Sequence, residues 1–218
     1  MEKVLILRAC RQDRTSHKEF QWPESSPVEA PDWSPKPECG RGLHGLLWGE
    51  GNSSHLAMYG NPLWQVVEVD SSDIIDLDGK VKFPRGEVIY TGTREGATGL
   101  IYKSAPNGTI IHYLSLTGGN HSTLTGGEYS TLTGGNHSTL TGGDNSTLTG
   151  GYNSALTGGE YSTLTGGYDS TLTGGYGSVV VWVWHEIGRK RVKSFEVGID
   201  GVEPNVPYRL IDGKLTRV

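Results

Sequence analysis

Residues 118–141 read GGNHSTLTGGEYSTLTGGNHSTLT, and this octad, Gly-Gly-x-x-Ser-Thr-Leu-Thr, decides the fold. Gly-Gly pairs begin at residues 118, 126, 134, 142, 150, 158, 166 and 174, so the period of eight never slips. A fixed short period indicates a repeat architecture in which each unit stacks on its neighbours. A disordered low-complexity segment is the alternative, but disorder gives no reason to keep leucine in phase.

Each octad predicts one short strand and one corner. Ser-Thr-Leu-Thr combines β-branched residues with one apolar position and is bounded by turn-forming residues. Because side chains alternate across a strand, Leu124 and Ser122 are expected to point inward, and Thr123 and Thr125 outward. Gly-Gly-x-x is expected to form the corner, with the glycines supplying positive φ.

Two octads are needed for one coil, because a single octad is too short to go round a core and return. Asn120-His121 recurs sixteen residues later as Asn136-His137, which supports this pairing. We therefore predict a short β-solenoid of about four coils, stacked about 4.8 Å apart. The inward serine hydroxyls are expected to bond one another or the corner backbone as internal ladders.

These paired octads resemble the central repeats of bacterial ice nucleation proteins, which read like Gly-Tyr-Gly-Ser-Thr-x-Thr. The resemblance is carried by residues 166–173, Gly-Gly-Tyr-Asp-Ser-Thr-Leu-Thr, and by 174–178, Gly-Gly-Tyr-Gly-Ser. It covers about a third of the chain and implies a solenoid that organises water or ice. The flanks are more similar to uncharacterised bacterial and phage proteins, which set such repeats between a small N-terminal domain and a C-terminal β segment. That group implies no activity.

The chain of 218 residues is expected to be mainly β and to have three parts. Residues 1–105 form a small β-rich N-terminal domain, 106–181 the solenoid, and 182–218 a C-terminal β-hairpin cap. Strands are predicted over 3–9, 63–69, 87–90, 179–184 and 191–199, hairpins over 73–81 and 208–217, and a helix over 93–104 that caps the first coil. The proline-rich stretch 11–37 is expected to be irregular, and the glycine-rich stretch 38–49 to form a compact turn.

Composition and charge exclude several classes of function. No apolar run has the form of a signal peptide or the length of a membrane span, so we expect a cytoplasmic protein with no membrane partner. Two cysteines fit a reducing compartment without a disulfide framework. The net charge of −5 makes a nucleic-acid partner unexpected. A rod that mimics DNA is a further alternative, but the repeat carries few acids.

Four residues in the N-terminal part are of the types that bind zinc: Cys10, His17, Cys39 and His44. Their spacing, Cys-x6-His followed by Cys-x4-His, matches no standard zinc finger. In the competing interpretation no cofactor is bound: Cys10 only packs in the core, and the histidines lie on the surface. Cys39 with His44 is alternatively a nucleophile and base, although no orienting acid or oxyanion motif is evident.

The outward threonines are the candidate binding surface. Each Thr-x-Thr spans about 6.7 Å along its strand and rungs repeat at about 4.8 Å, which approximates an ice-lattice spacing. One face is interrupted by Ala155, so we expect binding on the other. That face carries Thr131, Thr133, Thr147, Thr149, Thr163 and Thr165. The alternative is that threonine is only a good exposed strand residue.

The leading hypothesis is a non-enzymatic repeat protein whose threonine-rich surface is a platform for binding or self-assembly. In its most specific form, the ligand is ice or ordered water. A homo-oligomer or filament is expected, because a short solenoid ends in open ladders and the run 179–184 is apolar. The alternative hypothesis places a ligand-binding or catalytic site, with or without zinc, in the N-terminal domain. The solenoid is then a rigid spacer or multimeriser.

Overall fold

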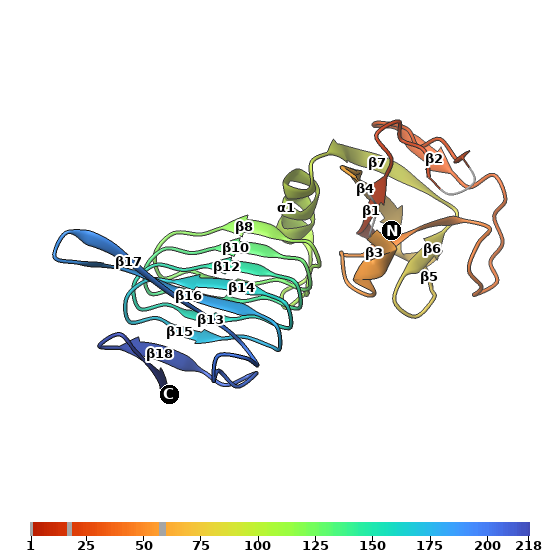
Figure 1. The fold of residues 1–218 in the computed structure, drawn as a ribbon. Coiled ribbons are helices and arrows are strands. Elements are labelled where there is room, and N and C mark those ends of the chain that lie inside the picture. The colour runs from red at the N-terminus through yellow and green to blue at the C-terminus, as the bar shows by residue number, and fades with distance from the viewer. Residues whose placement is uncertain (1, 17–18, 57–59) are drawn as a thin grey trace. The chain divides into compact units, whose positions relative to one another are not determined.

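The computed structural model describes residues 2–16, 19–56 and 60–218. It divides into two compact units, Met1–Ile111 and His112–Val218, which are traced from red to blue in Figure 1. His17, one of the predicted zinc ligands, lies outside the described residues.

The N-terminal unit is built on an antiparallel sheet with the strand order β2-β7-β4-β1-β3-β6-β5. Its strands are β1 (Lys3–Cys10), β2 (Pro27–Glu29), β3 (Leu43–Leu47), β4 (Leu63–Asp70), β5 (Ile75–Asp76), β6 (Val81–Phe83) and β7 (Arg85–Gly92). Two 3-10 helices, η2 (Ser53–Leu56) and η3 (Ser71–Asp73), lie in the connections. The predicted strands within β1, β4 and β7 are confirmed, as is the β5–β6 hairpin at Asp78-Gly79.

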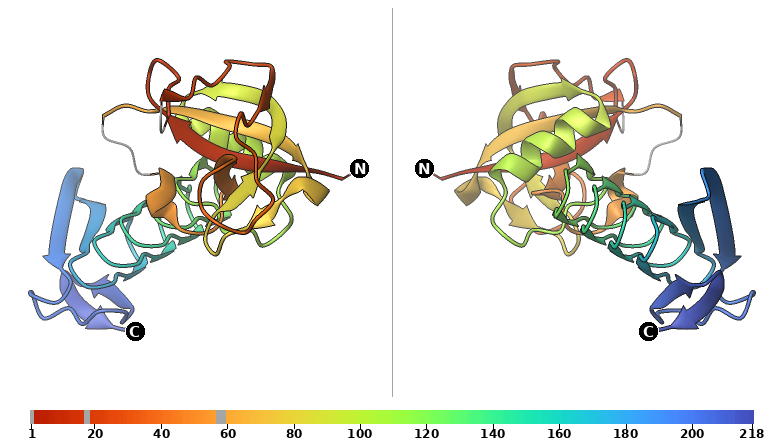
Figure 2. Two further views of the ribbon diagram at one scale, coloured as in Figure 1. Left: turned by 90° about the vertical axis from the view of Figure 1, so that its right-hand side faces the viewer. Right: turned by 90° about the vertical axis from the view of Figure 1, so that its left-hand side faces the viewer.

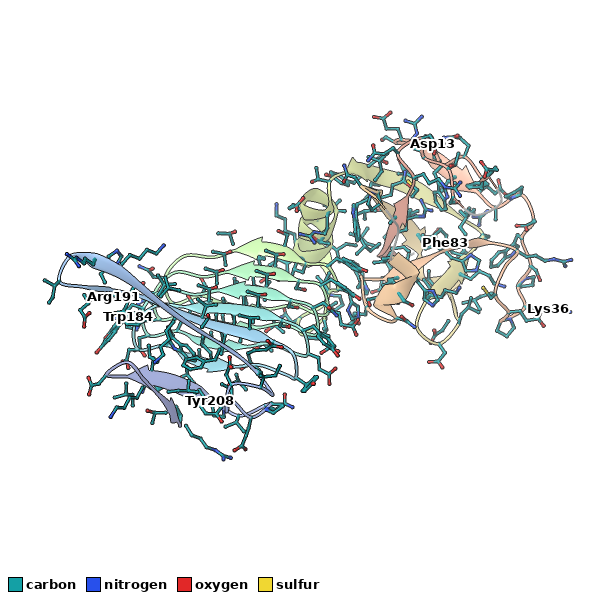
Figure 3. All side chains as sticks on the ribbon, in the orientation of Figure 1. Asp13, Lys36, Phe83, Trp184, Arg191 and Tyr208 are labelled. Atoms are coloured by element: carbon teal, nitrogen blue, oxygen red, sulfur yellow. The ribbon has the colours of Figure 1, made fainter. Side chains whose placement is uncertain are left out.

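Strand β1 lies between β3 and β4 in the sheet, and its apolar residues from Val4 to Leu7 are buried in the core of this unit. Helix α1 (Arg94–Ser104) lies across β1, β4 and β7, as Figure 2 shows, and buries Ile101. Its predicted N-cap is confirmed, since the Thr93 side chain accepts a hydrogen bond from the Gly96 N–H. Phe83, labelled in Figure 3, is fully buried in the core.

Two strands lie where the sequence predicted an irregular stretch and a compact turn. β2 falls within the proline-rich stretch and pairs with β7 at the edge of the sheet. β3 falls within the glycine-rich stretch and pairs with β1. The glycine that made this segment read as a turn is required by the packing, because a Cβ on Gly45 would lie 2.4 Å from Ile6 Cγ2 and 2.8 Å from the Leu7 carbonyl oxygen.

The second unit is the predicted β-solenoid, and its strands form two separate sheets in which the coil strands are parallel (Figure 1). One sheet has the order β17-β16-β14-β12-β10-β8 and the other β19-β18-β15-β13-β11-β9. The coil strands are β8 (Ser115–Thr117), β9 (Thr123–Thr125), β10 (Thr131–Thr133), β11 (Thr139–Thr141), β12 (Thr147–Thr149), β13 (Ala155–Thr157), β14 (Thr163–Gly166), β15 (Thr171–Thr173) and β16 (Val179–Glu186). Each strand pairs with the strand two places along the chain, so one coil takes two octads.

Leucine and serine fill the interior of the coils, as predicted. The leucines from Leu132 to Leu172 are 0–1% exposed, and the serines from Ser130 to Ser178 are 0–2% exposed. The serine hydroxyls form internal ladders with the backbone. Ser162 Oγ accepts a hydrogen bond from the Ser146 N–H at 3.1 Å and donates one to the Gly143 carbonyl oxygen at 3.2 Å. The interior serine hydroxyls from Ser138 to Ser178 therefore have hydrogen-bond partners, whereas the Ser130 Oγ is buried without one.

The expectation that the glycine pairs supply positive φ is wrong. Positive φ occurs instead at the residue just before each serine, for example at His137 (57°) and Tyr161 (55°). The paired glycines other than Gly119 are required for space. A Cβ on Gly142 would lie 2.8 Å from the Ser146 Cβ, and one on Gly143 would lie 2.8 Å from the Glu128 backbone nitrogen in the preceding coil.

The last coil is closed by two antiparallel hairpins. β17 (Arg189–Glu196) pairs along the whole of β16, and β18 (Tyr208–Ile211) pairs with β15 and with β19 (Lys214–Arg217). The predicted hairpin around Asp212-Gly213 is confirmed. In the apolar run 179–184, Val180 and Trp182 are each 1% exposed, whereas Trp184 is half-buried. Val180 and Trp182 are therefore not available as a contact surface.

Candidate functional site

The predicted binding face of the solenoid consists of threonine rungs in exact parallel register. Thr131, Thr147 and Thr163 are paired in order along β10, β12 and β14. Thr133, Thr149 and Thr165 form the second column, and these rungs lie one coil apart. All six side chains lie on the side of the strands away from the buried leucines, and they are half-buried or exposed.

The ends of these columns differ in chemistry. On β8, Ser115 and Thr117 pair with Thr131 and Thr133 and extend the columns with hydroxyl groups. On β16, Val179 and Val181 continue the register without a hydroxyl group. The hydroxyl-bearing surface therefore runs from β8 to β14 and ends in valine on β16, the first strand of a closing hairpin.

The opposite face has the same geometry with one interruption. Ala155 on β13 pairs with Thr139 on β11 and Thr171 on β15, so one column loses a hydroxyl and a methyl group between two threonines. This face is also shorter at its closed end, where β18 pairs with β15 antiparallel. The two faces form a matched pair on one backbone, which makes each a control for the other.

The corners carry ladders that were not predicted from the sequence. The Asn120 Oδ1 accepts a hydrogen bond from the Asn136 N–H at 2.9 Å, and the Asp144 Oδ1 accepts one from the Glu160 N–H at 2.8 Å. Aromatic rings stack along the same corners, including the His121–His137 pair, whose ring centroids are 5.0 Å apart. Five corner tyrosines are 40–60% exposed: Tyr129, Tyr152, Tyr161, Tyr168 and Tyr176. The sixteen-residue recurrence of the corner dipeptides was the available signal for these ladders.

Three of the four candidate zinc ligands, Cys10, Cys39 and His44, lie within the described residues. Cys10 is buried at the end of β1, where its thiol contacts Gln65 Oε1 at 3.6 Å, and burial raises its pKa. Cys39 is exposed, and its sulfur lies 3.1 Å from the Lys80 Nζ. Within the described ranges, no three His, Cys, Asp or Glu side chains are grouped so as to hold a metal ion.

Cys39 and His44 nevertheless border the same cavity, with a volume of about 820 Å³. The His44 Nε2 accepts a hydrogen bond from the Gly40 N–H at 3.4 Å. Burial, together with the positive charges of Lys80 and Lys82, lowers the pKa of His44 to about 4. His44 is therefore a neutral imidazole at neutral pH, and the Lys80 ammonium lies beside the thiol.

The fold and the repeat surface define a short β-solenoid protein with β-rich flanks. The chain is similar to ice nucleation proteins over less than half of its length. It is 44% identical to an ice nucleation protein of Pseudomonas fluorescens over 102 residues, which are 46% of the chain and 8% of that protein. It is 41% identical to ice nucleation protein InaU of Pantoea ananas over 98 residues, 44% of the chain and 10% of that protein. The match to an ice nucleation protein of Xanthomonas campestris pv. translucens is 37% identical over 108 residues, 49% of the chain and 7% of that protein.

These matches confirm the resemblance drawn from the octads, while the chain spans only about a tenth or less of the length of each relative. A second match covers residues 4–101, which fit a domain of unknown function, DUF7666. No solved structure matches the chain. None of the helices in the described ranges is both long and apolar enough to cross a bilayer.

Proposed function

We propose that this is a non-enzymatic repeat protein whose threonine columns on β10, β12 and β14 form a platform that binds ice or ordered water. The observation that carries the proposal is the register of these strands. Thr131, Thr147 and Thr163 are paired in sequence, and so are Thr133, Thr149 and Thr165. A ligand with a repeating surface, such as a lattice, is bound best by a protein surface that has the same repeat.

The columns are held rigid before any ligand arrives, which supports a role in binding. Threonine is stiff at χ1, so a stacked column loses little side-chain entropy when it meets a lattice. Each strand is backed by a buried leucine, and the hydroxyl groups of Ser146 and Ser162, just before β12 and β14, are hydrogen-bonded to the backbone of neighbouring coils. The backbone beneath the threonines of β12 and β14 is therefore held in place from the interior.

The small size of the platform favours association of several copies. Three complete rungs with one partial rung span about 14 Å by the usual strand spacing, which is too little to template a large ice embryo alone. The closing hairpins cover the last coil, and β17 carries four basic residues that disfavour pairing at its outer edge: Arg189, Lys190, Arg191 and Lys193. We therefore propose that copies associate side by side along the solenoid rather than through that end.

The test compares a threonine in the middle of each face. Thr147→Lys places a long charged side chain at the centre of the proposed face, whereas Thr139→Lys makes the same change on the opposite face. Freezing-point hysteresis, ice-crystal shaping and light scattering are measured on the full chain. We expect Thr147→Lys to abolish hysteresis and shaping and Thr139→Lys to retain most of both. Loss of neither activity, or equal loss from both variants, would contradict the assignment of the face.

If the unmodified protein shows neither hysteresis nor shaping, ice binding is refuted and the self-assembly platform is what remains. Light scattering then decides whether the same surface joins copies, because Thr147→Lys should shift an oligomer toward smaller species. A ligand-binding role for the N-terminal unit rests on a different observation, the cavity bordered by Cys39 and His44.

A further inference from the structure

The cavity in the N-terminal unit is lined by basic and aromatic side chains. Its volume is about 820 Å³, and its walls come from β1, β3 and the loops between residues 16 and 56, with Lys80 from the β5–β6 hairpin. Among the described residues, Arg8, Arg41 and Lys80 are the cations that line it, and Asp32 is the only acid. Asp32 is exposed to solvent, so its charge is largely screened by water.

Arg8 is the unusual member of this lining. It lies on the central strand β1 and is only 5% exposed. Its guanidinium lies over the Trp22 ring, 3.4 Å from the ring centroid, and Nη1 donates a hydrogen bond to Gln65 Oε1. Burial is the largest cause that lowers the pKa of Arg8, to about 10, so the side chain keeps its charge at neutral pH.

The charge of Arg8 is not neutralised within the described part of the chain. No carboxylate there forms an ion pair with it, and its Nε has no hydrogen-bond partner. Gln65 is a neutral acceptor, fixed in place because its Nε2 donates to the Pro23 carbonyl oxygen and to Thr91 Oγ1. A buried cation is costly unless it is paired with an anion. An anion bound in the cavity would supply the negative charge that the guanidinium of Arg8 lacks.

We propose that this cavity binds a small organic anion whose carboxylate or phosphate group pairs with the guanidinium of Arg8. A planar guanidinium presents parallel donors that match both groups. Phe20 and Trp22, packed edge to face at 5.4 Å, supply an apolar wall for the body of the ligand. Lys80 and Arg41 add positive charge. This site lies within the N-terminal unit and is independent of the threonine platform.

The test uses a pair of fluorescent dyes that share their rings and differ in charge. The full chain is titrated with 8-anilinonaphthalene-1-sulfonate and with uncharged N-phenyl-1-naphthylamine. We expect saturable binding of the sulfonate at one site, displaced by benzoate or inorganic phosphate. Because a hydrogen bond to a charged group is worth a factor of about ten or more in affinity, Arg8→Met should weaken the sulfonate at least tenfold and the uncharged dye less than twofold.

Two further variants keep the test decisive. Arg11→Met removes an exposed arginine that does not line the cavity and should leave both affinities unchanged. If Arg8→Met does not fold, the Arg41→Met/Lys80→Met double variant replaces it and should weaken only the sulfonate. Equal binding of the two dyes, no effect of removing these cations, or an equal effect of Arg11→Met would overturn the proposal.

Discussion

Leu148 lies at the centre of the solenoid and gives the sharpest test of the inward leucine column. Its side chain is 0% exposed, and it is stacked in register between Leu132 and Leu164. Truncation to alanine removes buried methyl and methylene groups and leaves a cavity, which typically costs about 2–5 kcal/mol. The rungs above and below are fixed by backbone hydrogen bonds, so the gap has little freedom to close.

For a unit of this size, each kcal/mol lowers the melting temperature by about 4 °C, so Leu148→Ala should lower it by about 8–20 °C. Leu148→Asp adds an unpaired carboxyl group to the same gap and should abolish the cooperative melting of the solenoid. The matched control is Thr147→Ala, the next side chain on the same strand, which points outward. It should change the melting temperature by less than about 3 °C.

The assay is thermal unfolding by circular dichroism, with amide hydrogen exchange to separate the solenoid from the N-terminal unit. Separate transitions are expected to be resolved by exchange, because a chain of two units need not unfold in one step. If Leu148→Ala melts within about 3 °C of the unmodified protein, the inward assignment of leucine is refuted. The same conclusion follows if Thr147→Ala costs as much as Leu148→Ala.

Two further predictions concern a corner glycine and a buried histidine. Gly143→Ala should destabilise the solenoid by about 1–3 kcal/mol, because its Cβ would meet the backbone of Glu128, whereas Gly119→Ala, with nothing within 4 Å, should be neutral or slightly stabilising in urea titrations. The pKa of His44 is about 4 in the folded protein and about 6.5 in the unfolded chain. Because the folded state disfavours the protonated imidazole, the contribution of His44 to stability is fully present above pH 6.5 and is lost as the pH falls toward 4. The urea midpoint of the N-terminal unit should therefore fall more between pH 7 and pH 4.5 in the unmodified protein than in His44→Gln, and equal falls would refute this.

The period of eight was sufficient to predict the solenoid because the octad allows only one assignment of inward and outward side chains. Leucine must be buried, and alternation then buries serine and exposes threonine. The conformation of the corners was predicted wrongly, because Gly-Gly favours positive φ only as a local preference. The packing instead places positive φ on the residue before serine and uses the glycines for the close approach of coils.

The N-terminal site was less predictable because its parts lie far apart in the sequence. Arg8 reads locally as the charged end of an apolar strand, and Trp22 and Lys80 carry no pattern that joins them to it. Gly45 made β3 read as a turn, although its missing side chain is what allows β3 to pack against β1. Both features depend on tertiary contacts that no short window of sequence contains.

The repeats themselves provide an internal comparison that bears on the threonine platform. In the seven octads from residue 118 to residue 173, thirteen of the fourteen outward strand positions are threonine and one is Ala155. The fourteen corner positions of the same octads are also largely exposed, yet they hold Asn, His, Glu, Tyr and Asp. Recent duplication does not account for this contrast, because it would have kept the corners uniform too. Strand propensity alone does not account for it either, since valine, isoleucine and tyrosine fit an exposed strand as well as threonine does. Among the exposed positions of the octads, only the outward strand positions are uniform. This supports a requirement for a regular surface of hydroxyl and methyl groups, because stability or solubility alone would not require the same residue at every rung.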